Sequence, residues 1–545
     1  MRMDLSAAFD FFDRSEELNR VGIALSREKD INRLLETIVL AAKTITQADA
    51  GTLYRMEEGK LRFEIIRTDS LGLSLGGTTG RPIHLDPIPL FDEAGRPNES
   101  MVVAYAALRE TTVNIGDAYA AQGFDFSGTR LFDQKTGYRS RSFLTVPMKN
   151  HEDEVIGVLQ LINARNPDSG DIIPFSAADQ RLAESLASQA AIVLTTRLLI
   201  NQLEHLFESF INLINAAIDD KSPYTGRHCE RVPALTMMLA EAAHHSTEGP
   251  LEDFVMTDKD RYELKIAGLL HDCGKVTTPV HVVDKATKLE TIFDRIHLVD
   301  TRFEVLKRDA EIEMLRGRIE AMERGDGDEK TRLEARFSAV VEALEEERAF
   351  LRSSNIGSEA MSPEDQERVR AIGTHRKWRN ESGVWSDFLS ADEITNLAIR
   401  SGTLTADERQ VINHHIEVTI QMLESLPWPR HLKNVPEYAG GHHERMDGKG
   451  YPRGLTREQM SVPARIMGIA DIFEALTAGD RPYKKGKTLT EALTILGKFR
   501  LNGHIDPDLF DVFVREKVWL RFAQEFLDAE QIDDVDLSRI PGYRA

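Results

Sequence analysis

Residues 176–218 read SAADQRLAESLASQAAIVLTTRLLINQLEHLFESFINLINAAI, and no proline interrupts the chain before Pro223. Ser176 precedes the run as a helix cap. From residue 192 the spacing alternates steps of four and three, which places these side chains on one face: Ile192, Thr196, Leu199, Leu203, Leu206, Phe210, Leu213 and Ala217. The stretch predicts one long connecting helix with an apolar seam.

The seam leaves two alternatives for this helix. A repeat of this kind is typical of a coiled coil, in which a second copy of the chain covers the seam. A long helix packed against its own domain would show a similar pattern. We expect a homodimer, because the helix joins two regions of different character.

The region before the helix, residues 1–195, has mixed α/β character. Residues 30–48 repeat apolar side chains at helical spacing, and LRFEIIRTDS (61–70) is typical of a strand. The stretch FLTVPMKNHEDEVIGVLQLINA (143–164) contains two more strands around the polar turn KNHEDE, which predicts a hairpin.

The region after the helix, residues 205–515, is mainly helical. It is interrupted at about residues 300–400 by a charged segment, in which two helical stretches flank the turn RGDGDE (324–329). We expect an antiparallel helical hairpin inserted into a helical domain, followed by a C-terminal helix and tail over residues 516–545. The predicted fold class is a multidomain α+β protein.

Composition narrows the function. The net charge of −21 over 545 residues argues against duplex nucleic acid as a partner, since such binding depends on lysine and arginine. No apolar run reaches the roughly 20 residues that span a bilayer. Two cysteines cannot form a disulfide framework, so we expect a cytoplasmic protein.

Histidines gather in one part of the helical region. Five of the sixteen lie within residues 414–443, and the stretch GGHHERMDGKGYPRGL (440–455) places a pair before a glycine-rich turn. Histidine and carboxylate together suit iron, manganese or zinc better than magnesium or calcium. A lone histidine is more often structural, so further ligands must come from elsewhere.

Three other segments supply such ligands. AGLLHDCGKV (267–276) sets His271 and Asp272 side by side, with Lys275 on the same face if the helix continues. Asp471 lies inside an apolar helix, and His228 lies near a helix start. A buried histidine, carboxylate and ammonium are costly unless they are paired or bound to metal. Together the segments supply ligands for two metal ions.

HDCGK and HHERMDGKGYP resemble the HD-GYP family, a branch of the HD phosphohydrolases. The resemblance covers residues 205–515 and implies an all-α domain with a centre of two divalent metal ions, iron or manganese. It also implies hydrolysis of cyclic di-GMP to the linear dinucleotide pGpG and on to GMP. The metal ligands it implies are His228, His271, Asp272, His415, His442, His443 and Asp471.

The sequence departs from the family pattern at two positions. The intermediate histidine normally lies a few tens of residues after the His-Asp pair, whereas His415 lies more than 140 residues after Asp272. His297 is nearer the usual separation, but His415 has the expected surrounding pattern and is preferred. Some members hold a third metal through a glutamate where this chain has Tyr224, so two metals are predicted.

The resemblance also implies roles around the metals. Asp272 would bridge them and be the least replaceable residue, and Lys275 would stabilise phosphate charge or assist the leaving oxygen. Arg481 and Lys484 would meet the second phosphate of the substrate. The pocket rim would be shaped by Asp447, Gly450, Tyr451 and Pro452.

Residues 1–195 resemble a GAF domain, a fold that senses small molecules. The resemblance rests on NIGDAYAAQGFDFSGTRLFDQKTGYRSRSFLTVPM (114–148). Candidate ligand residues are Asn163, Phe175 and Asp179. Ala164 and Gln180 replace a lysine and a glutamate of the cyclic-nucleotide-binding signature. A cyclic nucleotide, another small molecule and a purely dimerising role therefore remain open.

Two other functions compete with cyclic di-GMP hydrolysis. The chain could bind cyclic di-GMP without turning it over, as a receptor or as a scaffold for a diguanylate cyclase partner. It could instead hydrolyse another cyclic dinucleotide or a nucleotide. The intact ligand set favours an enzyme over a receptor, whereas the choice of substrate depends on pocket shape.

Overall fold

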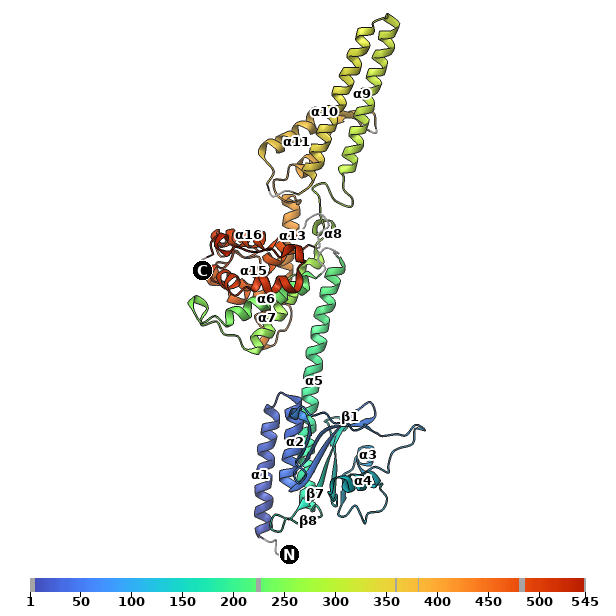
Figure 1. Cartoon of the computed structure of the whole chain (residues 1–545), viewed down its shortest axis with the longest axis vertical. Helices are drawn as coiled ribbons and strands as arrows, with labels where there is room; N and C mark the ends of the chain where they lie inside the picture. The colour runs from blue at the N-terminus through green and yellow to red at the C-terminus, as the bar shows by residue number, and fades with distance from the viewer. Residues whose placement is uncertain (1–4, 222–226, 358–359, 381, 480–485, 544–545) are drawn as a thin grey trace. The chain divides into compact units, whose positions relative to one another are not determined.

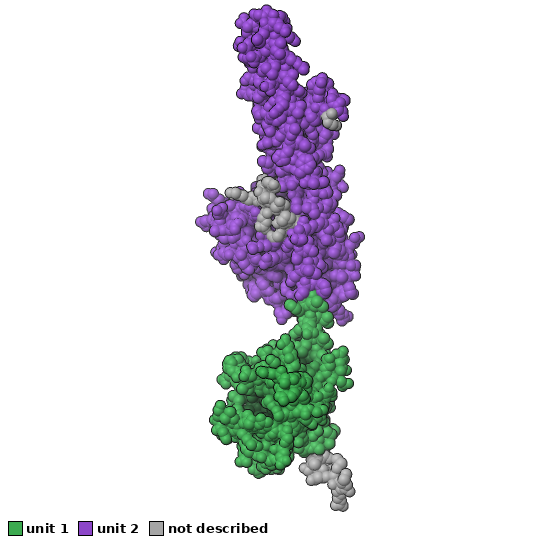
Figure 2. All heavy atoms as spheres, turned by 90° about the vertical axis from the view of Figure 1, so that its right-hand side faces the viewer, with its two compact units in different colours: residues 1–207 green, residues 208–545 purple. Residues whose placement is uncertain are grey.

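The computed structural model describes residues 5–221, 227–357, 360–380, 382–479 and 486–543. The chain divides into two compact units, Met1–Phe207 and Glu208–Ala545 (Figure 2). Unit 1 is a mixed α/β domain and unit 2 is mainly helical, so the predicted α+β multidomain fold is confirmed. Among the helices that the structure describes, none combines the length and the apolarity needed to cross a bilayer.

The described part of unit 1 contains an antiparallel sheet in the order β3–β2–β1–β7–β6–β5, with β4 beside β2 and β8 beside β7 (Figure 1). The strands are β1 Ala48–Glu57, β2 Lys60–Thr68, β3 Leu73–Gly76, β4 Ile88–Pro89, β5 Val113–Ile115, β6 Phe143–Lys149, β7 Val155–Arg165 and β8 Ile172–Ile173. The helices are α1 Leu5–Arg27, α2 Ile31–Thr46, α3 Val102–Arg109, α4 Ser127–Thr136 and α5 Ala177–Lys221, which continues into unit 2.

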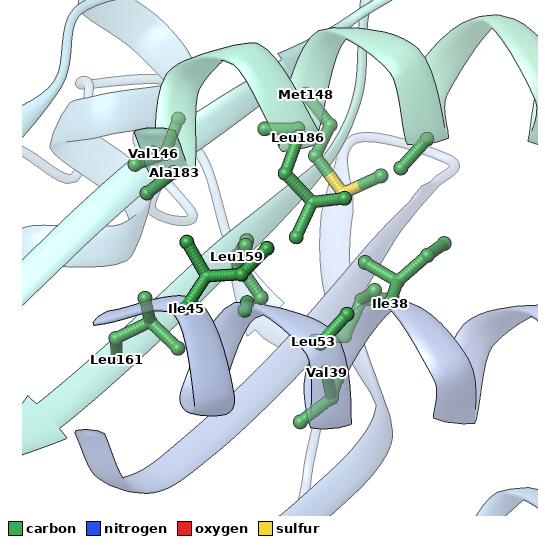
Figure 3. Close-up of a cluster of buried hydrophobic side chains, with 14 of the residues drawn as sticks. Ile38, Val39, Ile45, Leu53, Val146, Met148, Leu159, Leu161, Ala183 and Leu186 are labelled. Carbon is green, nitrogen blue, oxygen red and sulfur yellow. The ribbon is translucent and has the colours of Figure 1, made fainter. Parts of the chain in front are cut away.

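The two faces of this sheet pack against different helices. Leu53 is paired with Leu159, and the next residue, Tyr54, with Val158. Because successive side chains point to opposite faces, the leucines join a core with α2 and α5, while Tyr54 and Val158 pack toward α3. Figure 3 shows the first core, in which Leu186 of α5 lies with side chains of α2 and the central strands.

The structure confirms the predicted β6–β7 hairpin, which pairs antiparallel with Leu144 opposite Leu161. It also contains the helix expected at residues 30–48, as α2. Asp30 caps α2 by accepting a hydrogen bond from the Arg33 amide. Ser176 caps α5 in the same way, because its hydroxyl accepts from the Asp179 amide.

Helix α5 is a single element of 45 residues. One face packs into the unit 1 core through alanines and leucines such as Ala183 and Leu194. All eight residues of the predicted seam are exposed in the single chain, with 64% of Leu203 and 65% of Leu213 accessible. The helix thus packs on unit 1 through another face, the seam itself is not covered by the chain's own core, and the homodimer stays a prediction.

The helical domain of unit 2 is built from α6 His228–His244, α7 Asp258–Leu270, α8 Val280–Val283, α13 Ala406–Glu424, α14 Val435–Gly440, α15 Val462–Thr477, α16 Leu489–Leu501, α17 Pro507–Arg515 and α18 Val518–Phe526. Short 3₁₀ turns are η1 Gly77–Thr79 in unit 1 and, in unit 2, η2 Gly249–Leu251, η3 Cys273–Thr277, η4 Arg430–Leu432, η5 Arg457–Gln459, η6 Ala529–Gln531 and η7 Leu537–Arg539.

The inserted segment is more than the predicted hairpin. Helices α9 Ile296–Arg324 and α10 Gly327–Asn355 form that hairpin, and α11 Pro363–His375, α12 Ala391–Leu397, β9 Lys377–Arg379 and β10 Trp385–Asp387 accompany it. Phe303 of α9 and Phe388 pack ring to ring at 4.6 Å, within a buried cluster of the segment's own. The hairpin alone could not bury these aromatic side chains, which explains the additional elements.

The insertion begins and ends at one place in the helical domain. Lys285, just before it, is buried and donates hydrogen bonds at 2.8 Å to Glu408 and to Asn396. Glu408 also completes a capping box with Thr405 at the start of α13. The segment can therefore be long without displacing α13, the helix that carries His415.

Candidate metal centre

The first cluster joins His228, His271 and Asp272. His228 is the first residue of α6, and the other two follow the last residue of α7. His228 Nε2 lies 3.0 Å from Asp272 Oδ2 and 3.3 Å from His271 Nε2. Asp471 on α15 completes the group, with its Oδ1 3.5 Å from His228 Nε2. With metal–nitrogen bonds of about 2.1 Å, neighbouring ligands of one ion lie about 3 Å apart.

The second cluster joins His415 of α13 with His442 and His443, which follow α14. One ligand atom from each of these three side chains lies within 4.8 Å of the others. The imidazole rings of His442 and His443 are 4.1 Å apart, and those of His415 and His443 are 5.2 Å apart. The structure thus brings all seven predicted ligand residues into two neighbouring clusters.

Asp272 joins the clusters. Its Oδ2 faces the first, and its Oδ1 lies 3.2 Å from His415 Nε2 of the second. Three polar atoms of the described clusters are buried without a hydrogen-bond partner: Asp272 Oδ1, His415 Nε2 and His442 Nε2. The first two approach to 3.2 Å but are not aligned as a hydrogen bond. Buried polar atoms are costly when unsatisfied, so this donor set fits divalent metal ions.

Gly274 permits the close approach that unites the clusters. Its amide donates to Thr419 Oγ1 of α13 at 2.9 Å. A Cβ at this position would overlap the His415 carbonyl oxygen and would lie 2.6 Å from the Thr419 nitrogen. Helix α7 ends at Leu270, so Lys275 lies in η3 rather than in the continuing helix that the sequence suggested.

Burial and charge set the protonation of these groups. Burial and, to a smaller extent, the neighbouring His271 together lower the pKa of His442 to about 4, so that His442 is neutral at neutral pH. Burial tends to raise the pKa of Asp272, but Lys275, His271 and His228 together hold it well below its usual value. Burial lowers the pKa of His228, because it disfavours the charged imidazolium. Hydrogen bonds to Asp272 and Glu474 outweigh this effect and raise the pKa to about 10.

A cavity of about 210 Å³ opens at the clusters. Lys275 lines it, with its Nζ 2.5 Å from Asp272 Oδ2, and Tyr451 stacks on His443 at 4.9 Å. Glu444, which is buried, accepts hydrogen bonds from the amides of Arg453 and Leu455 and so holds the loop that carries Tyr451.

The other predicted rim residues lie in this loop. A Cβ at Gly450 would lie 2.5 Å from the Glu444 Cα, so the close packing requires glycine there. Asp447 pairs with Arg445 at 2.8 Å, and Pro452 follows Tyr451. Arg481, Lys484 and Tyr224 lie outside the described residues.

The structure distinguishes the two candidates for the intermediate ligand, His415 and His297, by their burial. His415 is buried in the second cluster, whereas His297 is exposed on α9 of the insertion. His414 is exposed on α13 and pairs with Glu417 at 2.8 Å. Its place next to His415 turns it away from the cluster, as helical geometry predicts.

The three candidate GAF ligand residues each have partners within unit 1. Asn163 accepts a hydrogen bond from the Arg141 amide and donates to the Arg139 carbonyl. Phe175 is buried in the α2–α5 core. Asp179 accepts from the Ser176 amide at the start of α5. All three side chains thus have structural partners, and their role as ligand residues stays a prediction.

Sequence reasoning missed Glu474 and Arg231, which line the same cavity. Glu474 Oε2 lies 2.6 Å from His228 Nδ1, and Arg231 donates to Glu474 Oε1 at 2.6 Å. The available signal was their spacing, because each lies three residues after a predicted ligand, His228 or Asp471, on the same helix.

Comparison with protein families agrees with this architecture. A GAF domain model matches residues 30–194, and two HD domain models match residues 225–348 and 390–509. The chain is a GAF and HD-domain protein. Its HD domain implies binding of divalent metal ions, and the two clusters are its candidate ligands.

Similar proteins include two phosphodiesterases named for different substrates. The chain is 48% identical over 81 residues to 3′3′-cGAMP-specific phosphodiesterase 1 of Vibrio cholerae, covering 15% of this chain and 19% of that one. It is 39% identical over 116 residues to a cyclic di-GMP phosphodiesterase of Pseudomonas aeruginosa, covering 21% of this chain and 27% of that one. The chain thus spans less than a third of the length of either relative.

We expect Gly274→Ala to separate η3 from α13 and so to move His415 away from Asp272. The amount of Mn²⁺ that the chain binds should fall, as measured by elemental analysis of metal-loaded protein, because His415 would no longer lie beside Asp272. Gly327→Ala in α10 is the matched control, because a Cβ there meets nothing within 4 Å. Full metal content in Gly274→Ala would contradict the role given to this contact.

Proposed function

We propose that the chain is a metal-dependent phosphodiesterase that hydrolyses cyclic di-GMP to pGpG and on to GMP. The observation that carries the proposal is the buried carboxylate of Asp272 between two histidine clusters, beside a cavity. The HD domain and the phosphodiesterase relatives support a hydrolase. Two ions, iron or manganese, would be held by the seven ligand residues named above.

Metal ions in such a site would neutralise phosphate charge and lower the pKa of water. The residues of the chain supply the rest. Asp272 orients both clusters, and Lys275 holds its ammonium beside the carboxylate, where it faces an incoming phosphate. Burial lowers the pKa of Lys275, but Asp272 and Asp471 outweigh this and raise it, so the side chain stays charged. Tyr451 covers one side of His443 and limits the entry of water.

A second candidate substrate is 3′3′-cGAMP. The relative from Vibrio cholerae that is 48% identical is named for 3′3′-cGAMP, which shares the cyclic phosphodiester ring with cyclic di-GMP. Both dinucleotides present the same phosphates to Lys275 and the clusters. Their bases differ, so the walls of the cavity rather than the metal ligands would decide between them.

We expect the manganese- or iron-loaded chain to convert cyclic di-GMP to linear products, resolved by chromatography. Asp272→Asn should abolish conversion, because the amide is a weaker bridging ligand and carries no charge. Intact cyclic di-GMP and intact 3′3′-cGAMP after incubation with metal-loaded protein would refute the proposed function.

The same variant separates an enzyme from a receptor or a cyclase-binding scaffold. A receptor would retain binding of cyclic di-GMP in Asp272→Asn and would show no turnover in the unchanged protein. Equilibrium dialysis with labelled dinucleotide measures the first property, and the chromatographic assay measures the second.

We further propose that the chain is a homodimer through α5. Its seam exposes apolar side chains from Ile192 to Leu213, while the opposite face of the first part of the helix, residues 182–194, is buried in the core of unit 1. Exposed apolar residues that repeat at coiled-coil spacing are typical of a parallel helix pair. A second copy of α5 offers the same seam and would cover it.

The double substitution Leu206→Glu and Leu213→Glu should convert the dimer to a single chain, because it places charges inside the seam. Sedimentation equilibrium measures the mass. Asn201→Glu with Asn212→Glu on the outer side of the same helix adds equal charge and should leave the dimer intact. A dimer that survives both pairs of substitutions would exclude this interface.

The GAF domain would regulate the site through α5. Lys221, its last residue, donates hydrogen bonds to the carbonyls of Lys275, at 3.3 Å, and of Val276 in η3. The end of the helix thus contacts the turn that carries Lys275. A ligand of the GAF domain can act on the site only if it binds active and inactive arrangements with different affinity.

Inserting one alanine after Glu204 should change the basal kcat several-fold, because it rotates one part of α5 against the other by about 100°. Inserting seven residues adds about two turns and should restore both the phase and the kcat. Steady-state assays compare the three chains. Equal kcat in all three would argue against transmission through the helix.

A further inference from the structure

Four histidines of the clusters have a hydrogen-bond partner at ring Nδ1, and the partner of His228 differs in kind from the other three. Three ring Nδ1–H groups donate to a backbone carbonyl three residues earlier: His271 to Gly268 at 2.7 Å, His415 to Ile412 at 2.5 Å and His442 to Ala439 at 2.6 Å. His228 instead directs its Nδ1 at the Glu474 carboxylate, at 2.6 Å. The acceptor is a carboxylate anion in this case and a neutral carbonyl in the other three.

We propose that Glu474, held by Arg231, is a positioning residue that makes the two metal sites unequal by strengthening the ligand His228. The proposal rests on the proposed metal centre. A carboxylate that accepts the Nδ1 proton leaves Nε2 as the nitrogen that would bind a metal once the proton it shares with Asp272 is displaced, and the negative charge of the carboxylate makes the imidazole a stronger donor to that metal. The first cluster would therefore bind its ion more tightly than the second.

The packing of two helices fixes this arrangement. His228 and Arg231 lie three residues apart on α6, and Asp471 and Glu474 lie three apart on α15. Each helix therefore supplies one ligand and, one turn further on, one supporting side chain. Only 2% of Glu474 and 5% of Arg231 are accessible.

Arg231 keeps the carboxylate in place. Its Nε donates to Glu474 Oε1 at 2.6 Å, while the other oxygen, Oε2, accepts from His228. Both carboxylate oxygens are thus engaged, which restricts rotation of the side chain. A buried carboxylate without a cation would be costly, so Arg231 also stabilises the charge on which the effect depends.

Glu474→Gln tests the charge at nearly constant shape. The amide can accept from only one of Arg231 and His228 at its single oxygen, so the His228 tautomer is no longer fixed. A calorimetric titration of metal-free protein with Mn²⁺ alone should show two classes of site in the unchanged chain. In Glu474→Gln the tighter class should weaken ten- to a hundredfold, and the weaker class should stay unchanged.

Two further variants make the result specific. Glu474→Asp keeps the charge and should recover part of the lost affinity, which a purely structural role would not predict. Glu263→Gln is the matched control, because Glu263 is buried in the same unit and accepts hydrogen bonds from Asn434 without contacting a metal ligand. It should leave both Mn²⁺ affinities unchanged.

The outcomes are distinguishable from failure of the proposed function. Unchanged Mn²⁺ affinities in Glu474→Gln with a raised KM would overturn the inference and place the carboxylate near the substrate. Equal weakening of both classes, or of the Glu263→Gln control, would also overturn it. The expected pattern of affinities without turnover of any cyclic dinucleotide would support the inference and refute the phosphodiesterase.

Discussion

The helical domain depends on burying one carboxylate. Asp272 is 2% accessible, and desolvating its charge is unfavourable unless positive partners surround it. Lys275 lies 2.5 Å from Oδ2, the imidazole of His228 on α6 lies 3.0 Å from the same oxygen, and that of His415 on α13 lies 3.2 Å from Oδ1. The segments around residues 228, 271 and 415, which are far apart in sequence, each bring an imidazole to this carboxylate. The groups that stabilise the buried charge are therefore largely the groups of the candidate metal centre, and Asp471 of α15 adds a second carboxylate to them.

The clusters can form despite the long insertion, because the contacts that bring η3 and α13 together lie close to the ends of the inserted segment. Gly274 and Thr419 touch across a separation of 145 residues. The insertion buries its own aromatic side chains, Phe303 and Phe388, in a cluster whose members lie within residues 289–397. Lys285 and Glu408 close its two ends. Once the ends are fixed, the cost of a longer loop grows slowly with its length, which explains why α13 keeps its place.

The sequence predicted the features that depend on repetition or on reactive side chains. The Ser176 cap and the spacing of apolar residues predicted a helix over residues 176–218, close to the observed α5, and the resemblance to the HD-GYP pattern around His415 favoured this residue over the nearer His297. The sequence could not give the end of α7 at Leu270, because the local sequence HDCGK does not exclude a further helical turn, whereas the structure has the turn η3 there, packed against α13 through Gly274. Glu474 was missed since a glutamate in a helix is usually solvated, and its burial follows from the approach of α6. These features depend on tertiary contacts that no single segment encodes.

The net negative charge of the chain opposes the binding of a negatively charged ligand at this site. A net charge of −21 repels a dinucleotide that carries two phosphates, so attraction must arise locally. Lys275 and Arg231 line the cavity, but each is already paired with a carboxylate, Asp272 or Glu474. Their charges therefore attract an incoming phosphate less than unpaired cations would. Under the proposed function, most of the attraction for a phosphodiester would then come from bound metal ions. Such a site would gain affinity for substrate only after it had gained its metals, so that metal loading and substrate binding would be linked through the same buried carboxylate.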